Sequence, residues 1–334
     1  MESPGTEQAL PVAVTRAVAY ADIFDYPLTR AELHRYLYAF QVSRPELDAW
    51  ISRGGNGAAA ALELAGTYVV LRGRGDLVPL RHRREAIAHR LWADARRLTA
   101  RLARAPFVRM IAVTGALAVD NVGEHDDIDL LIVSQARRVW LCRALAAMLA
   151  RLLRRHGVVV CVNYVISESA LGISPADFFS ARELAQMIPV AGSEVYDAMR
   201  AANRWLDDLL PNAGGPPREM GSAPCRQSRV GRVVEWLLGG RLGGFLEACE
   251  RRRKVARMRR EYPHAREAFW SLDVYKGHFS GHRERIRIAY AQRLGRLNLG
   301  IGEGTQPPLI AAPPALQEPL APQPLPPGEP TRAP

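Results

Sequence analysis

The sequence predicts a multidomain α/β fold, and three observations support this prediction. Short helical patterns followed by two β-type runs occupy the first part of the chain. A central part alternates apolar β-type runs with helical periodicity, as in residues 130–133, 139–153 and 158–166. The last 32 residues hold 11 of the 24 prolines, which is typical of a disordered or polyproline tail. A length of 334 residues corresponds to about two or three domains at roughly 100 to 200 residues each.

The N-terminal part reads as three short helices and a hairpin. A helix over residues 12–24 ends before Pro27, and capping boxes at residues 29–32 and 43–46 begin two more. The β-type runs 62–64 and 67–71 follow, separated by an Ala-Gly turn. Three helices and then a hairpin is the order of a winged helix-turn-helix. Few base-reading side chains occupy the third helix, so a scaffold role is slightly favoured over DNA reading.

The composition indicates which classes of binding partner and metal site are to be expected. The chain has 45 basic and 34 acidic residues, a formal net charge of +11, and arginine at all but two of the basic positions. Arginine suits phosphate, so nucleic acid is a candidate partner through the arginine-rich residues 83–104 and 251–260. An arginine bias of the genome explains the charge equally well. The four scattered cysteines form no C-x-x-C motif, which excludes a zinc-binding motif and a disulfide framework.

The sequence also predicts a cytoplasmic protein with no membrane partner. No apolar run reaches the roughly 18 residues that a membrane span needs, and the longest candidate, 139–153, contains Arg143 and Arg151. The N-terminus lacks the basic start of a signal peptide. For the short apolar run 236–246, a buried helical hairpin is favoured over contact with a membrane. His278 and His282 lie four residues apart, but flanking glycines argue against a helical metal site.

The residues that carry chemistry lie at the start of a strand. Residues 111–113 form one apolar strand and 130–133 another, and Asp127 and Asp129 stand where the second begins. Strand residues two apart point to the same side, so both carboxylates project together. Adjacent carboxylates repel unless a cation lies between them, and hard oxygen ligands suit Mg²⁺. The pair therefore predicts a site for Mg²⁺ or Mn²⁺; the alternative is a solvated turn before a strand.

A phosphate-binding turn is predicted at Thr114, Gly115 and Ala116. Glycine lets the backbone approach a phosphate closely, and the N–H groups at the start of the following short helix would face that phosphate. Phosphoryl-type transfer needs little more than such positioning and neutralisation of charge.

At this point the chain resembles the nucleotidyltransferase superfamily, whose DNA polymerase β-like core carries a Gly-Ser turn and an Asp-x-Asp pair. Twelve positions separate Gly115 from Asp127, which matches the usual spacing, and residues 126–130 resemble the common Ser-Asp-Ile-Asp-Leu run. The wider chain resembles uncharacterised bacterial proteins with a winged helix before this core, through residues 20–29 and 113–118 and more thinly through 203–299.

The resemblance implies transfer of a nucleoside monophosphate from a nucleoside triphosphate to an acceptor hydroxyl that the sequence does not identify. Two departures bear on activity. Ala116 replaces the serine of the turn, and the strand 158–166 lacks the third carboxylate of active members. Asn163 or Cys161 stands at that third position. Three other acids are candidates to substitute in space: Glu124, Asp126 and Glu168.

The sequence thus supports two main functions: a metal-dependent nucleotidyltransferase, or a catalytically weak or inactive nucleotide-sensing or nucleic-acid-binding regulator on the same scaffold. A scaffold that binds partners through the proline-rich tail is a third. The fold expected is a winged helix, a nucleotidyltransferase-like mixed-sheet core, a C-terminal helical region and a disordered tail. The predicted boundaries are 11–82 for the winged-helix-like domain, 83–105 for a linker helix, 106–212 for the core and following helices, 213–228 for a linker, 229–300 for the helical region and 301–334 for the tail.

Overall fold

The protein is a mixed α/β structure built around a mixed β-sheet, as the sequence predicts in its coarse form. The computed structural model describes residues 4–54, 61–153, 159–220, 225–262, 269–277 and 282–299. The predicted tail, residues 301–334, lies outside these ranges. Within them, none of the helices combines the length and the apolar character that crossing a membrane requires.

The N-terminal part contains three helices and a three-stranded antiparallel sheet of order β1-β3-β2. Both predicted capping boxes form. The side chains of Thr29 and Ser43 each accept a backbone N–H from the first turn of their helix, and the glutamate three residues later accepts the backbone N–H of the capping residue. These elements are α1 (Pro4–Asp22), β1 (Leu28–Thr29), α2 (Arg30–Arg35), α3 (Arg44–Ser52), β2 (Leu62–Ala65) and β3 (Tyr68–Leu71).

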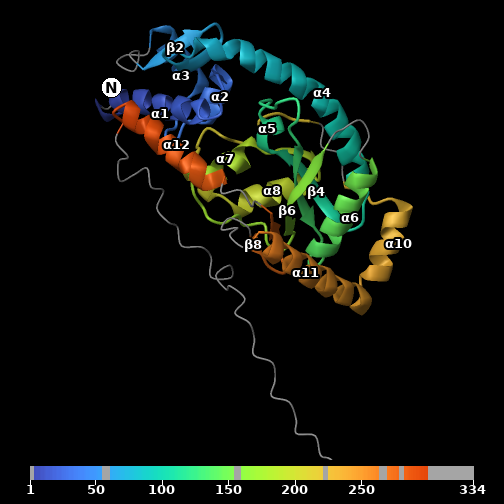
Figure 1. The fold of residues 1–334 in the computed structure, drawn as a ribbon. Coiled ribbons are helices and arrows are strands. Elements are labelled where there is room, and N and C mark those ends of the chain that lie inside the picture. Colours follow the sequence, from blue (N-terminus) through green and yellow to red (C-terminus); the bar gives the residue numbers. More distant parts are fainter. Residues whose placement is uncertain are drawn as a thin grey trace, which may run out of the picture.

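A long helix, α4 (Val78–Leu102), leads from the N-terminal part to the far end of the molecule (Figure 1). It begins five residues earlier than the predicted start at residue 83. Pro79 lies in its first turn, where the missing N–H has no intrahelical partner to lose. The segment after the hairpin therefore starts a helix and does not extend the hairpin.

The central sheet has six strands in the order β7-β4-β5-β6-β9-β8. Strands β5 and β6 are parallel and are joined by α6 (Val139–Leu153), whose bounds match the prediction; the other neighbours are antiparallel. The strands are β4 (Val108–Thr114), β5 (Ile128–Ser134), β6 (Val160–Ser167), β7 (Ile188–Ala191), β8 (Phe269–Trp270) and β9 (Val274–Lys276).

The two faces of this sheet bury two separate cores. Met110, Ala112 and Leu131 face the N-terminal helices and the helices after β6, whereas Ile111 and Ile132 face α4 and α6. The alternation follows from the two-residue period of a strand. The elements that complete the first face are α7 (Phe178–Gln186), α8 (Ser193–Ala202) and α9 (Trp205–Leu209).

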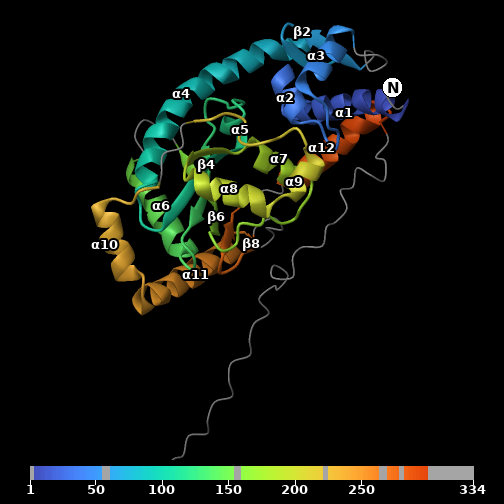
Figure 2. The ribbon, with the colours of Figure 1, turned by 180° about the vertical axis from the view of Figure 1, so that it is seen from behind.

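The C-terminal region is not purely helical, which corrects the prediction for residues 229–300. Strands β8 and β9 extend the central sheet beside β6, and Tyr275 packs in the second core against Trp140. The region's helices are α10 (Arg229–Leu238), α11 (Arg241–Glu261) and α12 (His282–Arg296). Figures 1 and 2 show α12 lying along α1, so the two ends of the described chain meet.

Candidate functional site

The two predicted aspartates lie at one end of the central sheet. Asp127 directly precedes β5, and Asp129 is the second residue of that strand. Asp129 is paired with Thr114 at the end of β4 and with Cys161 near the start of β6. Leu131 and Val133, which follow Asp129 at two-residue intervals, belong to the first core. The side chain of Asp129 therefore lies on the face that α7 and the N-terminal helices cover.

Gly115 makes the closest approach to this pair. It begins the short helix α5 (Gly115–Ala118) with a φ of +66°, and a Cβ built there would lie 2.5 Å from Oδ2 of Asp129. Both features require glycine. The Thr114 hydroxyl lies 3.5 Å from the Asp129 carbonyl oxygen, whereas Ala116 packs against the second core. Of the three residues predicted for the phosphate turn, two therefore adjoin Asp129.

The electrostatics of the site favour a cation. Burial, together with the charge of Asp127, raises the pKa of Asp129 to about 6. A hydrogen bond from Asn163 acts in the opposite direction. At neutral pH Asp129 is ionised, and keeping its charge in a partly buried place costs folding free energy. A bound cation would offset that free energy.

Two neutral side chains from β6, those of Cys161 and Asn163, contact the aspartate pair. The Cys161 thiol donates to Oδ2 of Asp127 at 2.9 Å, and Nδ2 of Asn163 lies 3.5 Å from Oδ1 of Asp129. Burial, with Asp127 beside it, raises the pKa of Cys161 to about 12, so this thiol stays protonated. The register of β6 shifts between Cys161 and Tyr164, which is a bulge, and bulges often aim side chains at a site. Cys161 and Asn163, the two residues that the sequence analysis considered for a third position, thus contact the aspartate pair, and neither is an acid.

The other candidate acids differ in their positions. Glu168 follows β6 at the opposite end of the sheet, where it accepts the Ala136 N–H at 3.0 Å, so it does not substitute. Asp126 accepts the Gly123 N–H at 2.7 Å, and its charge contributes to the raised pKa of Asp129. Glu124 is exposed on the same loop.

Two residues near the pair escaped the sequence analysis. The charge of Glu183 on α7 also raises the pKa of Asp129. Lys276 on β9 lies 4.0 Å from Glu183 and 5.2 Å from the ring centroid of Tyr164. A sequence signal existed, since only two lysines occur in the chain. Asp177 is the N-cap of α7, and its side chain accepts the Ser180 N–H.

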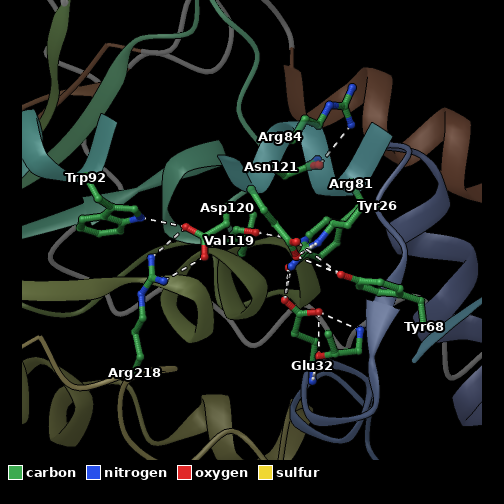
Figure 3. Close-up of polar contacts among 12 residues, drawn as sticks. Tyr26, Glu32, Tyr68, Arg81, Arg84, Trp92, Val119, Asp120, Asn121 and Arg218 are labelled. Carbon is green, nitrogen blue, oxygen red and sulfur yellow. Dashed lines mark hydrogen bonds and ion pairs between the residues drawn. The ribbon is translucent and has the colours of Figure 1, made fainter. Parts of the chain in front are cut away.

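The loop between α5 and Asp127 is held in place by α4 (Figure 3). Arg81 donates to the Val119 carbonyl at 3.2 Å, and Arg84 donates to Oδ1 of Asn121 at 3.1 Å. Asp120 accepts bonds from Trp92 and Arg218. The same Arg81 also pairs with Glu32 of α2. The site loop is thus fastened to the N-terminal part through α4 and through a direct bond from the Asn121 side chain to the Phe24 carbonyl at 3.1 Å.

The donor set fits a hard cation that completes its shell with other oxygens. Asp127 and Asp129 offer carboxylate oxygens, and Mg²⁺ commonly takes one or two carboxylates together with water and phosphate oxygens. In the described part of the chain, no three His, Cys, Asp or Glu side chains gather as a metal-binding group. The side chains of His278 and His282 lie outside the described residues.

Comparisons of the chain with known protein families, with curated proteins and with solved structures gave no match. Inference about function therefore starts from the residues and geometry described above.

Proposed function

We propose that the protein is a metal-dependent nucleotidyltransferase that transfers a nucleoside monophosphate from a nucleoside triphosphate to an acceptor hydroxyl. The observation that carries the proposal is the close approach of the Gly115 turn to the carboxylate of Asp129, whose pKa is raised to about 6 by burial and by the neighbouring Asp127. The proposal includes the finer fold assignment: a winged helix before a polymerase β-like core. The element order α1-β1-α2-α3-β2-β3 and the β4-α5-β5 unit support it.

The residues take the following roles in this proposal. Asp127 and Asp129 hold Mg²⁺ or Mn²⁺, and the Gly115 backbone lies against the triphosphate. Lys276 lies 4.0 Å from Glu183, whose charge reaches Asp129, and in this proposal it neutralises phosphate charge. When bound, the cation would stabilise charge on the transferred phosphoryl group and on pyrophosphate. The acceptor oxygen forms a bond to the α-phosphorus and its hydroxyl proton passes to solvent water. The bond between the α-phosphorus and the oxygen that bridges to the β-phosphate breaks, and pyrophosphate leaves with the electron pair.

A nucleotide sensor is the second candidate, and a specific observation favours it. The thiol of Cys161 and the amide of Asn163 stand where a third carboxylate would accept the hydroxyl proton. An amide cannot serve as a general base, and a thiol with a pKa near 12 does not do so at neutral pH. On this alternative, a triphosphate and cation bind at the same residues without turnover, and arginine-rich surfaces or the N-terminal part carry the response.

To test the proposal, the protein is incubated with each labelled nucleoside triphosphate, with Mg²⁺ or Mn²⁺, and with a host lysate. We expect pyrophosphate release and a labelled acceptor with the wild-type protein, and loss of both by at least about 100-fold in Asp127→Asn and Asp129→Asn. Asp94→Asn is the matched control, because Asp94 is a surface aspartate on α4 that lies 3.7 Å from Arg97. Full activity in both test variants would refute the assignment.

A further variant separates the enzyme from the sensor. Asn163→Asp places a carboxylate beside Asp129, at the position that β6 leaves neutral. If the protein is a sensor because it lacks an acid, this change should create transfer activity that the wild type lacks. Wild-type triphosphate binding and no transfer by either protein would leave sensing as the function. Absence of Mg²⁺-dependent triphosphate binding, measured by calorimetry, would count against both.

A further inference from the structure

The hairpin of α10 and α11 carries an apolar surface that faces solvent. Trp236 is 80 % exposed, Val230 73 % and Phe245 65 %. This surface, named here the hairpin patch, consists of Val230, Val233, Trp236, Leu237, Leu242 and Phe245. The prediction that residues 236–246 form a buried hairpin is therefore wrong. Contiguous exposed apolar surface of this kind usually marks a binding surface.

The hairpin is fastened to the body by polar and small residues. Glu235 of α10 accepts the Phe107 N–H and pairs with Arg109 at 3.1 Å, and Gly231 packs tightly on the Arg104 carbonyl. Ordinary surface helices bury their apolar face and expose their polar one. Helix α10 departs from this pattern, because Val230, Val233 and Trp236 are exposed beside its arginines while Glu235 is turned inward.

Helix α11 shows the same arrangement. Its Glu247 accepts the backbone N–H groups of Trp140 and Leu141, each at 2.8 Å, and so caps the start of α6. Gly243 lies against the end of α10, while Leu242 and Phe245 point to solvent. The outward apolar side chains are thus a consequence of how both helices are anchored.

The charges around the hairpin patch are of one sign. Arg229, Arg232 and Arg241 are exposed and have no carboxylate partner among the described residues. The acid of this stretch, Glu235, is turned inward. A second copy of the chain would bring arginines against arginines, which opposes self-association. A partner that complements the hairpin patch therefore presents an apolar surface with negative charges around it.

We infer that the hairpin patch binds an anionic lipid surface. Trp236, Phe245 and their apolar neighbours insert at the level of the headgroups, and the three arginines reach lipid phosphates while their stems stay among apolar groups. Figures 1 and 2 show α10 and the start of α11 forming a corner at the end of the molecule opposite the N-terminal elements. A corner can enter a membrane interface without a complementary groove. Such contact needs no helix that spans the membrane.

Vesicle flotation and intrinsic fluorescence test this inference on the full chain. Trp236 is the exposed tryptophan among six, so its emission reports insertion directly. We expect co-flotation and a blue shift with vesicles of phosphatidylglycerol and phosphatidylcholine, and about tenfold weaker binding to phosphatidylcholine alone. High salt should weaken the binding.

Three variants make the test specific. Trp236→Ser combined with Phe245→Ser should reduce partitioning by about tenfold or more, and the triple Arg229, Arg232 and Arg241→Gln variant by about tenfold on anionic vesicles. Leu64→Ser is the matched control, because Leu64 is an exposed leucine in β2, at the other end of the molecule. It should bind as the wild type does.

The opposite results are equally clear. Failure of the wild-type protein to bind anionic vesicles overturns the inference, and so does equal binding by the double serine variant. A dimer in sedimentation equilibrium that Trp236→Ser dissociates would identify a second copy as the occupant instead. None of these readouts depends on nucleotide transfer.

Discussion

At the scale of single residues, two features of the structure require glycine at position 115, and an experiment can separate them. Its φ of +66° favours glycine, and a Cβ there would lie 2.5 Å from Oδ2 of Asp129. Gly66 has a φ of +64° with nothing within 4 Å of its Cβ position. We expect Gly66→Ala to lower the free energy of unfolding by about 1 kcal/mol, and Gly115→Ala by about 2–4 kcal/mol because it adds a collision. Denaturant unfolding measures both; equal costs would show that the aspartate moves away freely.

Asp129 should make stability depend on pH. Its folded-state pKa of about 6 lies above the roughly 3.9 of an unfolded aspartate, so the folded state binds this proton more tightly. Its contribution to stability is therefore full below about pH 4 and is lost as the pH rises to about 6. We expect Asp129→Asn to stabilise the protein by about 1–2 kcal/mol at pH 7, with no gain at pH 3.5. Thermal unfolding at both pH values measures this.

Glu46 provides a contrast for that experiment. Its hydrogen bonds with Ser43 lower its pKa, so Glu46→Gln should destabilise the protein at pH 7 and change little at low pH. A gain of stability at pH 7 in both variants would indicate a general charge effect and contradict the assignment to Asp129. Mg²⁺ should also raise the melting temperature of the wild type and not that of Asp129→Asn.

The sequence predicted some of these residues and missed others for a physical reason. Asp127, Asp129 and Gly115 are adjacent in the chain or in neighbouring strands, so local periodicity and spacing brought them together. Asn163 followed from the order of strands. Glu183 and Lys276 reach the pair only through the docking of α7 and β9, which no local pattern encodes.

At the scale of elements, α4 joins the N-terminal part to the site loop, and Arg81 contacts both of them. The residue is 3 % exposed, pairs with Glu32 and Glu85, and donates to the Val119 carbonyl (Figure 3). We expect Arg81→Met to lower the free energy of unfolding by about 3–5 kcal/mol, because it leaves Glu32 without its partner in a partly buried place.

The control for Arg81 lies on the same helix. Arg97 is largely exposed and lies 3.7 Å from Asp94, so Arg97→Met should change stability by at most about 0.5 kcal/mol. Both variants are measured by denaturant unfolding. If Arg81→Met folds with wild-type stability, the network does not hold the loop. If it folds but binds triphosphate more weakly, α4 positions the site.

Elements were predicted correctly where the sequence carries a long periodic pattern or a specific capping motif. Helix α6 and the capping boxes at Thr29 and Ser43 agree with the sequence analysis, because a periodic 15-residue run and a reciprocal cap are strong local signals. Strands β8 and β9 were missed because two and three residues are too few to show a period. Their strand character comes from pairing with β6, a tertiary contact.

At the scale of the whole molecule, the C-terminal region completes the fold. The side chain of Arg293 on α12 donates to Asp22 of α1 at 2.6 Å, and Tyr290 packs against Tyr20. At the other side of the sheet, β9 covers the edge of β6. The predicted boundary at residue 229 therefore divides the sequence at a place where the structure has extensive contacts across it.

A truncation tests whether the rest of the fold needs the part of this region that follows residue 262. A chain ending at residue 262 lacks β8, β9 and α12, so β6 becomes an open edge and Trp140 loses the ring of Tyr275. We expect this chain to lose cooperative thermal unfolding and its near-ultraviolet circular dichroism. A chain ending at residue 299 keeps every described element and should melt within about 2 °C of the full chain. If the shorter chain instead unfolds cooperatively at the full-length temperature, β8, β9 and α12 are not needed for folding, and the sheet formed by β4 to β7 is stable without them.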